Sequence, residues 1–82
     1  MLYVNDTLYT FDPHFERRMI QRHLQVEWVQ TVMENPERYE LSNTTGNFLY
    51  ESLFKGYELP FRVIVDEDAK MIITAFFVTP FR

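Results

Sequence analysis

Three side chains suited to phosphate chemistry recur every four residues, at His14, Arg18 and Arg22. In an α-helix, residues four apart lie on one face, so these side chains would form one stripe. Arginine presents a planar fork of N–H donors that matches a phosphate group, and histidine can give or take a proton near neutral pH. The spacing therefore indicates a site for a phosphate-bearing ligand. Solvated arginines paired with acids of the chain, and a His14 that only opens the helix, would produce the same pattern.

Local signals place this stripe on the first of two short helices. Asp12-Pro13 is typical of a helix start, because an Asp side chain accepts from free backbone N–H groups and Pro is pre-set for the first helical position. We expect this helix from Pro13 to about Arg22, with His23 in its C-terminal turn. A second helix is expected from Val26 to Met33, stopped by Asn35-Pro36.

Alternating apolar residues predict strands on both sides of the helices. Before them, Leu2 to Phe11 alternates around Asn5-Asp6, as a short strand pair or one strand with a turn would. A hairpin with its turn at Asn43–Asn47 is expected next. The later strands are expected around Tyr39 and Leu41, from Phe48 to Lys55, from Phe61 to Val65 and from Met71 to Val78. The last run is almost continuously apolar, which predicts a central strand covered on both faces.

Length and composition limit the fold and the classes of function. A chain of 82 residues, 46% of them hydrophobic, is expected to form a single domain over residues 1–82 with a buried core. The predicted class is α+β, with two N-terminal helices, preceded by a short strand or hairpin, packed on one face of a three- to four-stranded antiparallel sheet. With no membrane span and no signal-peptide pattern, we expect a cytoplasmic protein.

Several kinds of site are disfavoured by what the sequence lacks. The absence of cysteine excludes disulfides, thiolate metal sites and cysteine nucleophiles. No spacing of His or carboxylate residues predicts a metal site, and no glycine-rich phosphate loop occurs, so neither a metal nor another cofactor is expected. The acids of the turn at 66–68 are expected to be solvated.

The charge distribution bears on nucleic-acid binding. A net charge of −4 argues against it, since affinity for nucleic acid comes largely from positive charge. Yet Arg17, Arg18 and Arg22 form a basic cluster within six residues. Arg62 and Thr74 are polar residues inside apolar strands, which marks them as candidates for a cleft. A rim position for Arg62 and plain sheet packing for Thr74 are the structural alternatives.

A set of motifs follows in a fixed order along most of the chain. His14-x3-Arg18-x3-Arg22 is followed by the helix that ends at Asn35-Pro36, by the strand Phe61–Val65, and by Ile72-Ile73-Thr74. Together they resemble the domain of unknown function 4258 family, over about residues 12–78. The family often has Gly where this chain has His23, which fits a helix C-terminus.

The layout of that family is similar to the RelE-like, barnase, EndoU and colicin group of metal-independent ribonucleases, which includes toxins of toxin–antitoxin systems. The resemblance implies that a ribose 2′-hydroxyl attacks the adjacent phosphate. It implies His14 as the acid/base group, Arg18 and Arg22 as phosphate binders and Thr74 as a hydroxyl donor, with Arg17 and Arg62 as further candidates for substrate binding. The partners implied are RNA and a cognate antitoxin.

Two functions of other classes fit the same sequence. One is a non-catalytic protein-interaction module, or an inactive member of the same family, whose acidic surface contacts a basic protein. The other is a domain that binds a small phosphorylated ligand through Arg18 and Arg22 without turnover.

Overall fold

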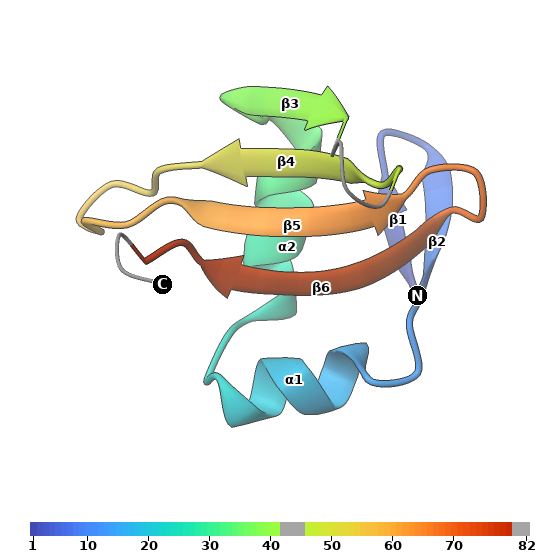
Figure 1. Cartoon of the computed structure of the whole chain (residues 1–82), viewed down its shortest axis with the longest axis horizontal. Coiled ribbons are helices and arrows are strands. Elements are labelled where there is room, and N and C mark those ends of the chain that lie inside the picture. The colour runs from blue at the N-terminus through green and yellow to red at the C-terminus, as the bar shows by residue number, and fades with distance from the viewer. Residues whose placement is uncertain (42–45, 80–82) are drawn as a thin grey trace.

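The computed structural model describes residues 1–41 and 46–79, which form six strands and two helices (Figure 1). In chain order these are β1 Leu2–Val4, β2 Thr7–Phe11, α1 Phe15–Gln21, α2 Val26–Glu34, β3 Arg38–Leu41, β4 Phe48–Ser52, β5 Phe61–Asp66 and β6 Met71–Phe77. Most of the turn expected at Asn43–Asn47 lies outside the described residues. The predicted α+β class is confirmed.

The strands form one mixed sheet in the order β1-β2-β6-β5-β4-β3. All neighbours are antiparallel except β2 and β6, which run parallel. The prediction of a three- to four-stranded antiparallel sheet is therefore wrong. The N-terminal hairpin turns at Asn5 and Asp6, both in the left-handed region with φ of 47° and 69°, and joins the sheet. β2 of this hairpin can pair with β6 in parallel because the long stretch of chain between the two strands forms a crossover connection.

The two helices occupy different positions on the sheet. α2 packs its buried face, which includes Val29 and Val32, over one face of the sheet, where Val63 and Val65 of β5 are also fully buried. α1 contacts β6 and runs beside that strand (Figure 1), and its buried Phe15 and Met19 belong to the same hydrophobic core, so both helices pack on the sheet. No helix within residues 1–41 and 46–79 is long and apolar enough to cross a membrane.

α1 is shorter at both ends than the predicted range of residues 13–22. The N-cap is His14 and not Asp12, which instead forms the turn before the helix: its carboxylate accepts the His14 N–H at 2.9 Å and its carbonyl accepts the Phe15 N–H at 2.8 Å. At the other end, His23 has a φ of 56° and its N–H bonds to the Ile20 carbonyl. The Leu24 N–H reaches the Met19 carbonyl, which completes a Schellman motif. His23 therefore occupies the helix-terminating position that the sequence predicts.

The sheet face opposite α2 carries a mixture of polar and apolar side chains. Phe61, Val63 and Val65 are buried toward α2, so the alternating Arg62 and Ile64 point to the opposite face. Cross-strand pairing puts Thr74 beside Ile64 and Phe76 beside Arg62 on that face, and all four are half-buried. The prediction that the last strand is covered on both faces is therefore wrong.

The Glu67 carboxylate interacts with side chains of β2, of β4 and of the turn before β6. Tyr9 of β2 donates to its Oε1 at 2.8 Å, and Tyr50 of β4 donates to its Oε2. Lys70 lies 3.5 Å from the same carboxylate, which is only 15% exposed. The expectation of a solvated turn is thus wrong for Glu67, because two long-range hydroxyl partners draw its side chain toward the core.

This arrangement predicts a loss of stability at alkaline pH. Burial, and secondly the hydrogen bond to Glu67, raise the pKa of Tyr9 from 10.0 to about 12, and the same two causes raise the pKa of Tyr50. Both groups hold their protons more tightly when folded. Their stabilisation is complete below pH 10 and decreases above it, and the part that Tyr9 contributes is lost as the pH rises through 12.

Chemical denaturation between pH 10 and 12 measures this effect. The free energy of unfolding of the wild type is expected to fall more steeply than that of the Tyr9→Phe/Tyr50→Phe variant. At pH 7 that variant should be less stable by about 3 kcal/mol, for two lost hydrogen bonds to a charged group. Tyr57→Phe is the control, since the Tyr57 hydroxyl has no hydrogen-bond partner among the described residues. Equal slopes for wild type and double variant would contradict the prediction.

Candidate functional site

β6 has a free edge over most of its length. β2 pairs with it only at Met71 and Ile72, and the Asp12 N–H then bonds to the Ile72 carbonyl at 2.9 Å. After Asp12 the chain turns into α1. Beyond Ile72, β6 therefore has β5 on one side and, within residues 1–41 and 46–79, no strand on the other.

The alternation of the backbone determines which groups of β6 point to this edge. The Val78 N–H bonds to the Pro60 carbonyl on the side of β5. In a strand, successive residues direct their N–H and C=O groups to opposite sides, so Ala75 and Phe77 direct theirs away from β5. The register between β5 and β6 shifts at Ile73, whose carbonyl group also points away from β5, because Arg18 reaches it. These carbonyl groups need donors from outside the sheet.

Arg18 and Arg22 supply those donors. Arg18 Nη1 donates to the Ile73 carbonyl at 3.2 Å, and Arg22 Nη1 donates to the Ala75 carbonyl at 2.9 Å. The same Arg22 nitrogen also donates to Thr74 Oγ1 at 3.1 Å. Two successive turns of α1 are thus joined to two successive outward-facing positions of β6, and both guanidinium groups are held in defined places.

The fork of each of these guanidinium groups stays available. Arg18 and Arg22 contact β6 only through Nη1, so Nε and Nη2, which together form the bidentate fork, remain for a ligand. The forks of Arg38 and Arg62 are instead occupied, since Glu40 and Glu51 respectively accept from both nitrogens at 2.7–2.8 Å. Arg18 and Arg22 are therefore the better candidates for binding an anion.

The charges of these two arginines are also poorly compensated. Arg18 lies 3.9 Å from Asp12, at the limit of an ion pair, and is 37% exposed. Arg22 forms no ion pair with any acid of residues 1–41 and 46–79. Neutral carbonyl groups fix these cations without cancelling their charge, so an incoming anion would meet an oriented positive group.

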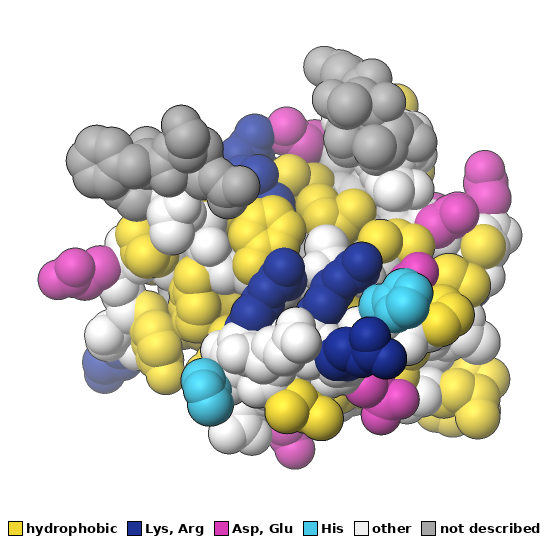
Figure 2. Space-filling view, turned by 60° about the horizontal axis from the view of Figure 1, so that its bottom comes forward, with side chains coloured by type: hydrophobic (Ala, Val, Ile, Leu, Met, Phe, Trp, Pro, Cys, Tyr) yellow, Lys and Arg dark blue, Asp and Glu magenta, His cyan; other side chains and the backbone are white. Residues whose placement is uncertain are grey.

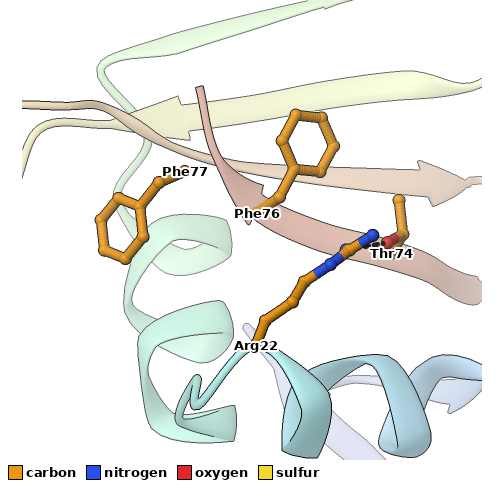
Figure 3. A pocket seen from close by; sticks show the side chains of 4 residues that line it. All are labelled: Arg22, Thr74, Phe76 and Phe77. Atoms are coloured by element: carbon orange, nitrogen blue, oxygen red, sulfur yellow. Dashed lines mark hydrogen bonds between the residues drawn. The ribbon is translucent and has the colours of Figure 1, made fainter. Parts of the chain in front are cut away.

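A pocket of about 300 Å³ lies at this edge of β6, lined by Arg22, Thr74, Phe76 and Phe77. The rings of Phe76 and Phe77 project to opposite sides of the strand, and the Arg22 side chain rises from the end of α1 to Thr74 (Figure 3). The outward N–H groups of β6 point to the same edge, and sheet edges of this kind can form anion sites. The volume suits a single phosphate or one base-sized group.

The surface around α1 is locally basic. On the face that α1 and the adjoining sheet form, Lys and Arg side chains gather in the centre, with a histidine side chain on either side of the group (Figure 2). Hydrophobic side chains border the same group. A basic surface bordered by apolar side chains is thus present in a chain of net charge −4.

The predicted site residues are brought together only in part. Arg18, Arg22 and Thr74 meet at the edge of β6, as the stripe and the polar exception in the last strand predict. His14 is exposed at the start of α1, and its imidazole forms no hydrogen bond with Arg18, Arg22 or Thr74. It stands on the same stripe, about 6 Å along the helix axis from Arg18 and about 12 Å from Arg22.

The remaining candidates have other positions. Arg17 is exposed and makes no hydrogen bond or ion pair with another described residue. Arg62 lies on the open sheet face and is bound by Glu51. In the described part of the chain, no three His, Asp or Glu side chains are grouped so as to hold a metal ion.

Sequence reasoning missed Phe76, Phe77 and the strand edge itself. The available signal for Phe76 was its place two residues after Thr74, which puts both side chains on one face of the strand. The edge carbonyl groups leave no signal in residue types, since every residue has one.

The comparisons with known proteins leave this site to be interpreted from its geometry. No protein-family model matches the chain, and it matches no curated protein and no solved structure. The chemistry of the site therefore rests on the two anchored arginines, the Thr74 hydroxyl and the pocket beside them.

Titration with inorganic phosphate tests whether the edge of β6 binds anions. We expect the backbone amide resonances of Ala75 and Phe77 to shift with saturation in the wild type, because their N–H groups share the edge with the Arg22 fork. The shifts should disappear in Arg22→Gln and weaken in Arg22→Lys, which keeps the charge without the fork.

Lys55→Gln is the matched control for charge removal, since Lys55 is exposed and has no partner among the described residues. Circular dichroism must show that each variant is folded, because the Arg22 variants lose two hydrogen bonds from a charged donor, worth about 1.5–3 kcal/mol each. Phosphate-dependent shifts of equal size in wild type and Arg22→Gln would rule out the site.

Proposed function

We propose that this chain is a metal-independent endoribonuclease of the toxin type, which cleaves RNA by attack of a ribose 2′-hydroxyl on the adjacent phosphate. The observation that carries the proposal is the pair of open arginine forks, Arg18 and Arg22, held one helical turn apart by β6 carbonyl groups. A pair at this spacing suits neighbouring phosphates of one strand. The resemblance of the His14-x3-Arg18-x3-Arg22 motif to the domain of unknown function 4258 family agrees with this proposal.

The proposed reaction needs two proton transfers and stabilisation of negative charge. The 2′-oxygen loses its proton and bonds to phosphorus, the bond from phosphorus to the 5′-oxygen breaks, and that oxygen takes up a proton. The products are a 2′,3′-cyclic phosphate and a 5′-hydroxyl end. His14 is the proposed proton-transfer group.

Charge builds up on the phosphate oxygens as the 2′-oxygen attacks, and positioned donors lower the energy of that state. Because His14 lies nearer to Arg18 along α1, we assign the scissile phosphate to Arg18 and the next phosphate to Arg22. Thr74 accepts a hydrogen bond from Arg22, so its own hydroxyl proton is free to be donated to the phosphate at Arg22.

This proposal also names partners and a location. RNA is the substrate, and the toxin-type interpretation adds a cognate antitoxin, or another protein partner, in the cytoplasm. The net charge of −4 predicts weak long-range attraction of RNA. Local arginine contacts would therefore account for most of the binding, and cleavage is expected to be fastest at low salt.

Cleavage of a labelled mixed RNA pool in the presence of EDTA tests the proposal. The wild type is expected to cut and to leave 2′,3′-cyclic phosphate ends, whereas RNA with 2′-deoxy substitution should stay intact. His14→Ala and Arg18→Gln should lower the rate at least a hundredfold, the range for removal of a proton-transfer group or of a charge-stabilising donor.

Lys55→Gln, which removes a charge away from α1, should leave the rate unchanged. Full resistance of the RNA to the wild type, with His14→Ala indistinguishable from it, would refute the enzyme proposal. RNA that is bound through Arg22 but never cut would instead support a domain that binds RNA without turnover. The residue types that line the pocket favour this alternative. The four lining residues, Arg22, Thr74, Phe76 and Phe77, include no histidine and no acid.

A further inference from the structure

A single row of side chains crosses the sheet on the face opposite α2. Cross-strand pairing puts Arg38 of β3 beside Glu51 of β4, Glu51 beside Arg62 of β5, and Arg62 beside Phe76 of β6. Arg22 of α1 extends the row, with its guanidinium carbon 6.0 Å from the centre of the Phe76 ring. The row therefore leads from the far edge of the sheet to the pocket at β6.

Phe76 is the aromatic residue of this row. It is half-buried and it lines the pocket, so part of its ring faces open space. Arg22 lies on one side of it, and Arg62, fixed by Glu51 at 2.7 Å, is its neighbour on β5. The part of the ring that faces the pocket offers a stacking surface for a planar base, beside the Arg22 donors for its phosphate.

The charge of the row favours an anionic occupant. Arg22, Arg38 and Arg62 face two acids, Glu40 and Glu51, so the row is positive overall although the whole chain has a net charge of −4. Its positive excess is concentrated at Arg22, whose charge is not paired with any described acid.

We infer that the open sheet face binds single-stranded RNA, with one unpaired base stacked on Phe76 and its phosphate at the Arg22 fork. This inference rests on the proposed function and names the substrate class of the same site. A base in a duplex is stacked between its neighbours and cannot lie on Phe76, and a pocket of about 300 Å³ has room for one base but not for a helix. Double-stranded RNA is thus excluded as a substrate.

Binding is best measured in a His14→Ala background, where cleavage is removed and the row is intact. The probe is a fluorescein-labelled single-stranded RNA of roughly ten nucleotides, compared with the blunt duplex of the same sequence by anisotropy at low salt. Phe76→Leu should weaken binding of the single strand about tenfold, the range for loss of one stacked base. Phe76→Trp should bind as well as the parent or better.

Tyr3→Leu is the matched control, because Tyr3 is an aromatic strand residue that is 64% exposed on β1, away from the row. It should leave binding unchanged. Thermal unfolding of each variant shows whether it is folded, and Phe76→Trp keeps the test decisive if Phe76→Leu does not fold. Any of three results would overturn the inference. Phe76→Leu could bind the single strand as tightly as its parent, Phe76→Trp could bind it with a tenth of the parental affinity, or the duplex could bind as tightly as the single strand.

The outcomes also separate this inference from the ribonuclease proposal. Cleavage of RNA by the wild type, with no effect of Phe76→Leu on binding or rate, would refute the stacking site and leave the enzyme. Binding of the single strand through Phe76, with no cleavage by the wild type, would refute the enzyme and keep the RNA-binding face.

Discussion

The arrangement of α1 and β6 depends on one requirement. Beyond Ile72, where β2 no longer pairs with β6, the carbonyl groups on that edge of β6 need hydrogen-bond donors from elsewhere. Arg18 and Arg22 supply these donors at Ile73 and Ala75. Charged donors make stronger hydrogen bonds than neutral ones, about 1.5–3 kcal/mol each, so the same contacts dock the helix and fix the guanidinium groups. Because carbonyl groups are neutral, the cations keep their charge. The structural contact and the proposed anion site thus depend on one interaction.

Much of this site follows from local patterns in the sequence. The four-residue spacing of Arg18 and Arg22 puts both on one stripe, and in the structure both donate to carbonyl groups of β6. Thr74 could be identified because it is a polar residue in an apolar run, and it does contact Arg22. The helix limits near Asp12 and Asn35 were predictable because capping and proline effects act within a few residues.

The parts that were not predictable depend on long-range pairing. No local signal specifies that β2 runs parallel to β6, and this pairing decides both that the sheet has six strands and that α1 lies beside β6. The acceptors at Ile73 and Ala75 are backbone groups, which residue types do not distinguish. Glu67 was misjudged for the same reason, because Tyr9 and Tyr50 reach it from 58 and 17 residues away in the chain.

The central claim is that Arg22 presents an open fork while Arg62 does not. The most direct measurement follows the Nε–H resonances of the arginine side chains during titration with single-stranded RNA whose 2′-hydroxyl groups are methylated to block cleavage. The account predicts that the Arg22 Nε–H resonance shifts to saturation, while that of Arg62, which Glu51 already occupies, moves little. An Arg22 resonance that stays in place, or an Arg62 resonance that moves as far, would contradict it.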